Sequence, residues 1–311
     1  MIICNHQVQP GEKKRCALKV SERIQIPLWL VAGKEPGPTL IITAGVHGCE
    51  YVGLLTAKKL FEEIDPVGMR GQVVILPSVN EFGLYQGLKQ IVPDDGKNLN
   101  RVFPGKVDGT TSEQIAYAIE HEIYPHGDFL IDLHGGDCNE TMTPLVFFSK
   151  VAQECVVEKS RQAATFLQVD YRIPSTAKNG LYSYAAQCGI PSMLLEIGGQ
   201  GLWTQEQLEQ CLESLYSLMG HLDMMGSGRK NINQKEAVEA VYEDAESDGL
   251  WYPAVSPGQR ITTGMVLGVL EDLEGNELQR VRAKFDGVAW YFVTALGVRR
   301  GDDLIAYGRC Q

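Results

Sequence analysis

The stretch TLIITAGVHGCE, residues 39–50, joins a short apolar run to the start of a helical pattern. Residues 39–44 are apolar and rich in β-branched side chains, which predicts a strand buried on both faces. Gly45 ends this run, and a helical pattern follows from about Glu50 to Ile64. His47 and Glu50 therefore lie where a strand passes into a helix. Because they are three residues apart, their side chains can reach one point.

The same arrangement recurs along the chain. Three further apolar runs predict strands, at residues 72–77, 128–133 and 191–196. Helical patterns lie between the runs, at about residues 112–124, 151–168 and 180–188. Strands that alternate with helices indicate an α/β sheet with helices on both faces. Ligands bind at the carboxyl ends of the strands in such sheets, and His47, His134 and Glu196 are all expected at those ends.

A clear helix ends this part of the chain. Thr204 and Gln207 have the spacing of a capping box. The apolar residues that follow share one helix face, and they are Leu208, Cys211, Leu212, Leu215 and Met219. Thr111 and Gln114 repeat the capping pattern ahead of the helix expected near residues 112–124. Both helices are therefore predicted to start at a threonine.

The alternation of strand and helix patterns ends at about residue 225. Residues 226–236 are polar and predict a linker. After Tyr242, short apolar runs are separated by glycines, which is typical of a small all-β barrel or sandwich. We therefore expect an α/β domain over residues 1–225 and a β domain over residues 237–311.

The composition is that of an acidic globular protein. A formal net charge of −11 argues against a nucleic-acid partner, because phosphate binding needs clustered lysines and arginines. No apolar run approaches the roughly 18 residues of a membrane helix. The N-terminal residues show no signal pattern, so we expect a cytoplasmic protein without a membrane partner. The eight cysteines include no Cys-x-x-Cys pair and are expected to be reduced.

The residues at the predicted strand ends suggest a chemistry. Two imidazoles and one carboxylate are the protein ligands of many hydrolytic zinc sites, with the fourth position left for water. His47, Glu50 and His134 supply that set, and a carboxylate at Glu196 could take a proton from the water. The His-x-x-Glu pattern alone is weak, and the shared position at strand ends is the stronger indication of a metallohydrolase. Asp132 either contacts a ligand imidazole or faces away along its strand.

A second group of polar residues follows a Pro-Asp-Asp-Gly turn, in the motif NLNRVFPG at residues 98–105. The planar fork of Arg101 matches a carboxylate, and Asn100 can add a donor beside it. The alternative is an arginine that only ties this loop to the fold. Lys89 and Asn80 come earlier, after the second predicted strand, and are candidates for the same pocket wall.

Four motifs in order carry a family resemblance: HGCE at 47–50, NLNRVFPG at 98–105, DLHGG at 132–136 and EIGG at 196–199. Over residues 35–220 the chain resembles the succinylglutamate desuccinylase/aspartoacylase family of zinc carboxypeptidase-like hydrolases. The resemblance implies a mixed sheet covered by helices on both faces and one zinc ion per chain, held by His47, Glu50 and His134. It also implies that Asn100 and Arg101 bind the substrate carboxylate and that Glu196 is the general base and later the acid. Lys89 falls near the family's carbonyl-polarising arginine, where a lysine acts as a point charge.

The expected function is that of a zinc-dependent amidohydrolase that removes an acyl group from an N-acyl amino acid or a related small amide. The expected partner is thus a small-molecule N-acyl substrate. One alternative is a zinc carboxypeptidase, in which the same arginine grips a peptide C-terminus. Another is a non-catalytic binding protein on the same fold. The β domain lacks the Met-Lys-Met of a carrier domain, so we expect it to narrow the active-site entrance or to form a contact within a homo-oligomer.

Overall fold

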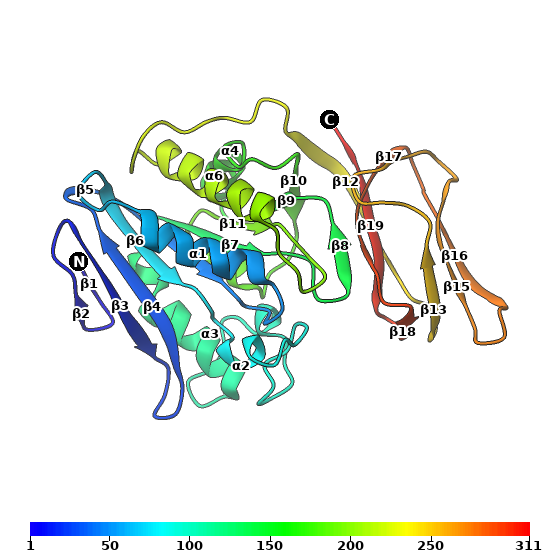
Figure 1. The fold of residues 1–311 in the computed structure, drawn as a ribbon, viewed down its shortest axis with the longest axis horizontal. Coiled ribbons are helices and arrows are strands. Elements are labelled where there is room, and N and C mark those ends of the chain that lie inside the picture. Colours follow the sequence, from blue (N-terminus) through cyan, green and yellow to red (C-terminus); the bar gives the residue numbers. More distant parts are fainter.

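The computed structural model describes residues 1–311 and has a long mixed sheet at its centre (Figure 1). The central strands are β3 (Glu12–Lys19), β4 (Gln25–Ala32), β5 (Glu35–Ala44), β6 (Arg70–Leu76), β7 (Phe129–His134), β9 (Leu145–Ser149), β10 (Tyr171–Ser175) and β11 (Ser192–Glu196). Their order is β10-β9-β11-β7-β5-β6-β4-β3. Strands β6, β5, β7 and β11 run parallel, whereas β9 and β4 are antiparallel to their neighbours β11 and β6. The expectation of a mixed α/β sheet is confirmed.

Helices cover both faces of this sheet. Helices α1 (Tyr51–Glu63), α4 (Glu154–Ala164) and α6 (Gln205–His221) pack on one face, and α3 (Thr111–Glu122) and α5 (Leu181–Gln187) pack on the other. Strand β5 shows why both faces are apolar. Its residues Leu40 and Ile42 join the core of α1 and α6, whereas Ile41 between them joins the core of α3 and α5. Alternate side chains of a strand point to opposite faces, so an uninterrupted apolar run fills both layers.

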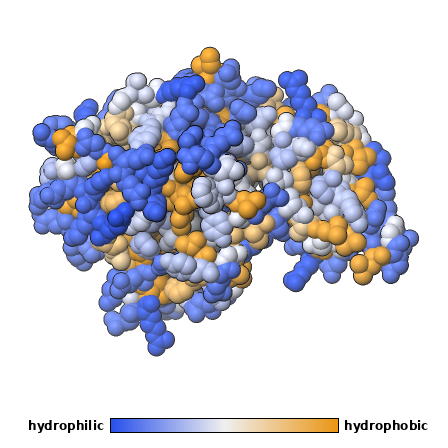
Figure 2. Space-filling view, viewed as in Figure 1, coloured by the Kyte–Doolittle hydropathy of each residue, from blue (hydrophilic) through white to orange (hydrophobic).

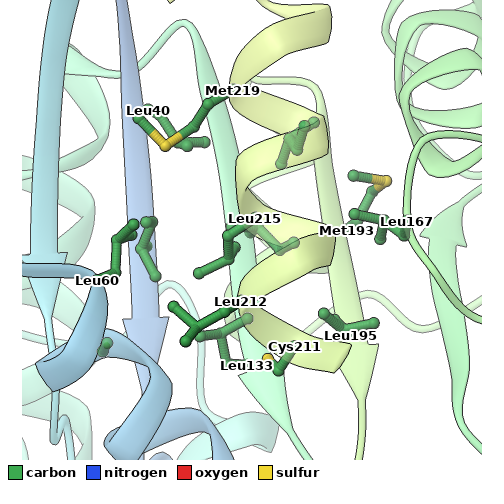
Figure 3. Close-up of a cluster of buried hydrophobic side chains, with 14 of the residues drawn as sticks. Leu40, Leu60, Leu133, Leu167, Met193, Leu195, Cys211, Leu212, Leu215 and Met219 are labelled. Carbon is green, nitrogen blue, oxygen red and sulfur yellow. The ribbon is translucent and has the colours of Figure 1, made fainter. Parts of the chain in front are cut away.

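Helix α6 lies across the sheet as its sequence pattern predicts. Thr204 and Gln207 form the expected capping box, because each backbone N–H donates to the other's side-chain oxygen, at 3.0 and 3.2 Å. The five apolar residues of the predicted face are all buried. Figure 3 shows Leu212, Leu215 and Met219 beside side chains of β5, β7 and α1. Each leucine buried in this way contributes roughly 1.5–3 kcal/mol, so this face fixes where α6 lies.

Short elements lie in the loops of this part of the chain. They are β1 (Ile2–Ile3), β2 (His6–Gln7), α2 (Glu81–Leu84), two 3-10 turns (Leu99–Arg101 and Tyr124–His126) and β8 (Glu140–Met142). The start of α3 differs from expectation by one residue. Its capping box is Thr110 with Glu113, whereas the hydroxyl of Thr111 donates to Asp94. Thr111 thus connects the 94–98 turn to α3, and Thr110 caps the helix.

After α6 the chain forms only strands, as expected. They are β12 (Lys235–Asp244), β13 (Gly249–Pro253), β14 (Arg260–Ile261), β15 (Val266–Glu271), β16 (Glu277–Arg282), β17 (Gly287–Val293), β18 (Gly297–Val298) and β19 (Asp303–Cys310). Strands β16, β15, β13 and β18 form a separate sheet, and its side chains share a core with β17 and β19. The β domain is therefore built from two sheets packed around one core.

The β domain is joined to the central sheet at two places. Strand β12 pairs with β10 through Tyr171–Lys235 and Arg172–Glu236, which makes β19 and β17 a continuation of the large sheet. Strand β8 pairs with β17 from Glu140 to Met142. Because β12 already begins at Lys235, the last two residues of the expected linker belong to the sheet. The division of the chain at residue 237 stays a prediction.

The surface mixes polar and apolar side chains. Figure 2 shows orange residues in small groups among blue ones on one face, and a notch between the α/β part and the C-terminal strands along its lower edge. None of the helices combines the length and the apolar character needed to span a membrane.

Candidate metal centre

The predicted site residues lie at the carboxyl ends of neighbouring strands. His134 ends β7 and Glu196 ends β11, and the two are directly paired across these strands. His47 and Glu50 lie in the turn from β5 into α1. The turn depends on Gly45, whose φ of +63° suits glycine. Gly48 lets α2 approach this turn closely, because a Cβ there would lie 2.2 Å from the carbonyl carbon of Gly83.

The three candidate ligands converge on one point. One nitrogen or oxygen atom from each of His47, Glu50 and His134 lies within 4.8 Å of the others, and all three residues are buried. His47 Nδ1 is 2.6 Å from Glu50 Oε1, and His134 Nδ1 is 2.9 Å from Glu50 Oε2. Burial opposes ionisation of Glu50, but the two imidazoles outweigh it and lower its pKa to about 2. The carboxylate is thus held in its ligating, charged form.

The second ring nitrogen of each imidazole, Nε2, also has a polar partner. His134 Nε2 lies 3.1 Å from Asp132 Oδ2, and Asp132 Oδ1 accepts a hydrogen bond from the Thr43 hydroxyl at 2.6 Å. His47 Nε2 lies 3.3 Å from Asn98 Oδ1. Metal-ligating histidines usually donate their second N–H to such oxygens, which leaves Nδ1 free for an ion. This donor set fits a divalent metal, and Asp132 contacts the imidazole of His134, a candidate ligand, instead of facing away along its strand.

Glu196 has an unusual environment for a carboxylate. Its Oε2 atom is buried and has no hydrogen-bond partner in the protein. Burial raises its pKa well above the ordinary value, His134 opposes this shift, and the negative charge of Glu50 adds to it. A buried polar atom without a partner is costly, so this position calls for a cation, a water molecule or a substrate group beside it. The lone oxygen is therefore a second observation that fits an ion held by His47, Glu50 and His134.

Asn100 and Arg101 lie in the Leu99–Arg101 turn and differ in their roles. The buried Asn100 accepts a hydrogen bond from the backbone N–H of Leu181 at 2.9 Å, so its Oδ1 ties the turn to the start of α5. Arg101 is exposed, donates only to the carbonyl oxygen of Asn100, and forms no ion pair. Its guanidinium therefore has donors free for an anionic group.

Lys89 has its charge already balanced. Its Nζ donates to Glu140 Oε1 at 2.9 Å and lies 4.0 Å from Asp137 Oδ2. Glu140 also accepts from the backbone N–H of Asp137 through its other oxygen. The structure thus places Lys89 in a network with the 137–140 loop. A role for Lys89 in polarising the substrate carbonyl stays a prediction.

One cavity of about 710 Å³ lies among the candidate ligands, Glu196, Asn100 and Arg101, whereas Lys89 is not among its lining residues. From the α/β part it is lined by His47, Glu50, Asn100, Arg101, His134 and Glu196, among others. Its opposite wall comes from the C-terminal strands and includes Glu239, Tyr242, Tyr291 and Asp303. No sequence pattern indicated this wall. The contact of Asn98 with His47 was not predicted either. Its position within the NLNRVFPG motif is the one sequence signal that indicates it.

Comparison with known proteins agrees with the family resemblance of the four motifs. A model of the succinylglutamate desuccinylase/aspartoacylase catalytic domain matches residues 36–222, which is more than half of the chain. The N-α-acetyl-L-2,4-diaminobutyric acid deacetylase of Halomonas elongata is 28% identical over 277 residues, which cover 85% of this chain and 80% of that protein.

Two solved structures resemble nearly the whole chain. They are the product-bound ectoine utilization protein EutE (DoeB) from Ruegeria pomeroyi and a succinylglutamate desuccinylase/aspartoacylase from Rhodobacter sphaeroides. Each gives a TM-score of 0.86 and covers 97% of this chain and 96% of the other, with sequence identities of 22% and 24%. At such identities the likeness shows the fold, including the C-terminal strands.

Proposed function

This chain belongs to the succinylglutamate desuccinylase/aspartoacylase family, and from that premise we propose that it is a zinc-dependent deacylase of N-acyl amino acids. The family and the Halomonas elongata relative make it a hydrolase of the deacylase class. The relative is named for an acetylated amino acid, and we carry over only that class of substrate.

One observation carries the proposal: His47, Glu50 and His134 converge beside the unpartnered Oε2 of Glu196. Two imidazoles and one carboxylate suit zinc, and one ion per chain is expected at this set. When bound, zinc would supply a Lewis acid that lowers the pKa of water and polarises the amide oxygen. The three candidate ligands are buried, and the lower local dielectric constant strengthens the charge interactions among them.

The protein's own residues supply the proton transfer and the substrate's orientation. The Glu196 carboxylate takes a proton from the attacking water and delivers it to the nitrogen as the C–N bond breaks. The products are the free acid and the free amine. Arg101 binds the substrate carboxylate and so places the amide near His134 and Glu196. Asn100 can donate a hydrogen bond to the substrate only through its Nδ2 group, because its Oδ1 already accepts one from the backbone N–H of Leu181.

A substrate panel tests the reaction class. With zinc-loaded protein, we expect N-acetyl amino acids to be hydrolysed and dipeptides with blocked N-termini to be left intact. Release of free amine is the measurement, with metal content determined on the same sample. Hydrolysis of the blocked dipeptides alone would favour the carboxypeptidase alternative. Metal content far below one ion per chain, with no gain of activity on adding zinc, would favour a non-catalytic protein.

Arg101→Gln tests carboxylate binding. We expect KM for an N-acetyl amino acid to rise about 10- to 100-fold, because hydrogen bonds between charged groups are lost. The same variant should treat the corresponding amino-acid amide, which has no carboxylate, almost as the wild type does. Arg23→Gln is the matched control, since Arg23 is exposed and is not among the residues that line the cavity. An equal loss on both substrates would show that Arg101 only supports the loop.

A further inference from the structure

A strained turn lies beside the cavity at Gln90. Its φ is +58°, a conformation that glycine adopts freely and other residues rarely do. The backbone N–H of Ile91 donates to the carbonyl oxygen of Lys89 at 2.6 Å, so Gln90 is the middle residue of a three-residue turn, a type that is rare when φ is positive. Gln90 lines the cavity, and the other non-glycine residues with a positive φ do not; they are Cys4, Asn5, Gln200 and Asp223. Strain of this kind usually has a function when it lies at a candidate site.

The chain after Gln90 is fixed to the surroundings of the metal centre. The carbonyl oxygen of Ile91 accepts a hydrogen bond from Asn80 Nδ2 at 3.0 Å, and Ile91 also pairs with Asn98 in an isolated β-bridge. Asn98 is the residue whose Oδ1 lies 3.3 Å from His47 Nε2. These contacts hold the turn in its strained form. They also place Gln90 next to a segment that contacts a candidate metal ligand.

The side chains of Lys89 and Gln90 differ in what they can offer a substrate. Lys89 Nζ donates to Glu140 Oε1 at 2.9 Å, and Lys89 is not among the residues that line the cavity. Gln90 does line the cavity, is half-buried, and forms no side-chain hydrogen bond with another residue. A glutamine amide has two N–H donors on Nε2 and an acceptor oxygen, Oε1. Of the two neighbours, Gln90 is therefore the one whose donors are free.

Amide hydrolysis needs a donor at the carbonyl oxygen. As the oxygen of water bonds to the amide carbon, the π electron pair of the C=O group moves onto the carbonyl oxygen, and it returns when the C–N bond breaks. Hydrogen-bond donors aimed at this oxygen stabilise the charge that it carries in between. The backbone N–H groups of the three residues after His134 already have acceptors, which are Glu50 Oε2, the carbonyl oxygen of Gly198 and Glu140 Oε2. The donor is therefore sought among the side chains that line the cavity.

We propose that Gln90 Nε2 donates a hydrogen bond to the carbonyl oxygen of the scissile amide and stabilises the negative charge that develops there. The inference rests on the proposed function and adds a catalytic residue to it, in the role that the sequence suggests for Lys89. The glutamine amide is neutral, so it acts without the charge of Lys89, which Glu140 already balances. The strained turn is the feature that directs this side chain to the cavity.

Gln90→Gly removes the donor and keeps the turn, because glycine adopts a positive φ without strain. With N-acetyl-L-alanine as substrate, we expect kcat to fall about 10²- to 10³-fold, the loss that follows removal of one oxyanion donor. KM should change less than about threefold, because the interaction is made mainly in the transition state. Gln200→Gly is the matched control and should keep the wild-type kcat. Gln200 also has a positive φ, +61°, but it is exposed and does not line the cavity.

Gln90→Glu distinguishes donating from accepting. The glutamate side chain has the same shape and keeps acceptor oxygens, but it loses both N–H donors of the amide. Its kcat should therefore fall at least as far as that of Gln90→Gly. A variant that keeps most of its turnover would show that Gln90 acts as an acceptor or only supports the loop, and it would overturn the inference.

Binding of a phosphonamidate gives a second readout that needs no turnover. N-(methylphosphonyl)-L-alanine carries a negatively charged oxygen where the carbonyl oxygen becomes charged in N-acetyl-L-alanine. By calorimetry on zinc-loaded protein, Gln90→Gly should bind it at least about tenfold more weakly than the wild type does, and both should bind free alanine equally. If the wild type hydrolyses no N-acetyl amino acid but shows this difference, the donor stands and the proposed reaction fails. Equal binding of the phosphonamidate, or a larger loss of kcat in a folded Lys89→Met variant than in Gln90→Gly, would overturn the inference.

Discussion

Replacing Glu196 by glutamine is expected to lower kcat about 10²- to 10⁴-fold, the range contributed by a positioned general acid–base. Glutamine has the same shape but cannot take the proton of water or return one to the leaving nitrogen. Glu196 is not one of the three converging ligands, so the variant should still bind metal. Its KM should change little, because Arg101 and the C-terminal wall remain. Steady-state kinetics and metal analysis on one preparation measure both quantities.

The control for this variant is Glu206→Gln, in the exposed first turn of α6, which should leave kcat unchanged. Melting temperatures should be compared for both variants to confirm that each is folded. Turnover within tenfold of the wild type would reject the role of Glu196. A loss of metal together with the loss of turnover would instead point to Glu196 as a ligand.

The sequence predicts which of the candidate site residues lie together because its signal is local. Apolar runs of six residues indicate buried strands, and polar residues directly after them must lie at one edge of a parallel sheet. His47, His134 and Glu196 can therefore be placed together from these runs alone. The face of α6 is predictable for the same reason, since its residues repeat with helical spacing. Neither pattern determines the orientation of each side chain. The sequence alone therefore does not decide whether Asp132 contacts His134.

Other parts of the fold depend on contacts that no local pattern records. The edge hairpin β3–β4 begins with a run of charged residues, Glu12–Arg15, and gives no strand signal on its charged face. The helix expected at 151–168 extends only from Glu154 to Ala164, because the segment after it turns into β10. The wall with Tyr291 and Asp303 requires β17 to pair with β8, about 150 residues away in the chain. Pairing over such distances cannot be read from spacing, so the sequence predicts that the β domain lies at the entrance but not which of its residues line the cavity.

The other large effect is expected at the candidate ligands. His134→Ala should reduce bound zinc to less than about one tenth of an ion per chain and abolish turnover, because two protein ligands hold zinc far more weakly than three. The substitution also removes the imidazole that now contacts Asp132 Oδ2 and Glu50 Oε2, and of the two oxygens Glu50 Oε2 keeps the backbone N–H of Gly135 as a partner. Leaving the buried Asp132 oxygen unpaired costs about 1–3 kcal/mol, so the melting temperature should fall as well.

Because a fall in stability alone could reduce metal content, metal-induced stabilisation is the sharper measurement. A ligand at 100 times its Kd raises the free energy of unfolding by about 2.7 kcal/mol, so added zinc should raise the melting temperature of the chelator-treated wild type. His134→Ala should lose this response. His126→Ala, which removes an exposed imidazole outside the cavity, should keep it. An unchanged response in His134→Ala would mean that zinc binds elsewhere, and the convergence of His47, Glu50 and His134 would then need another explanation.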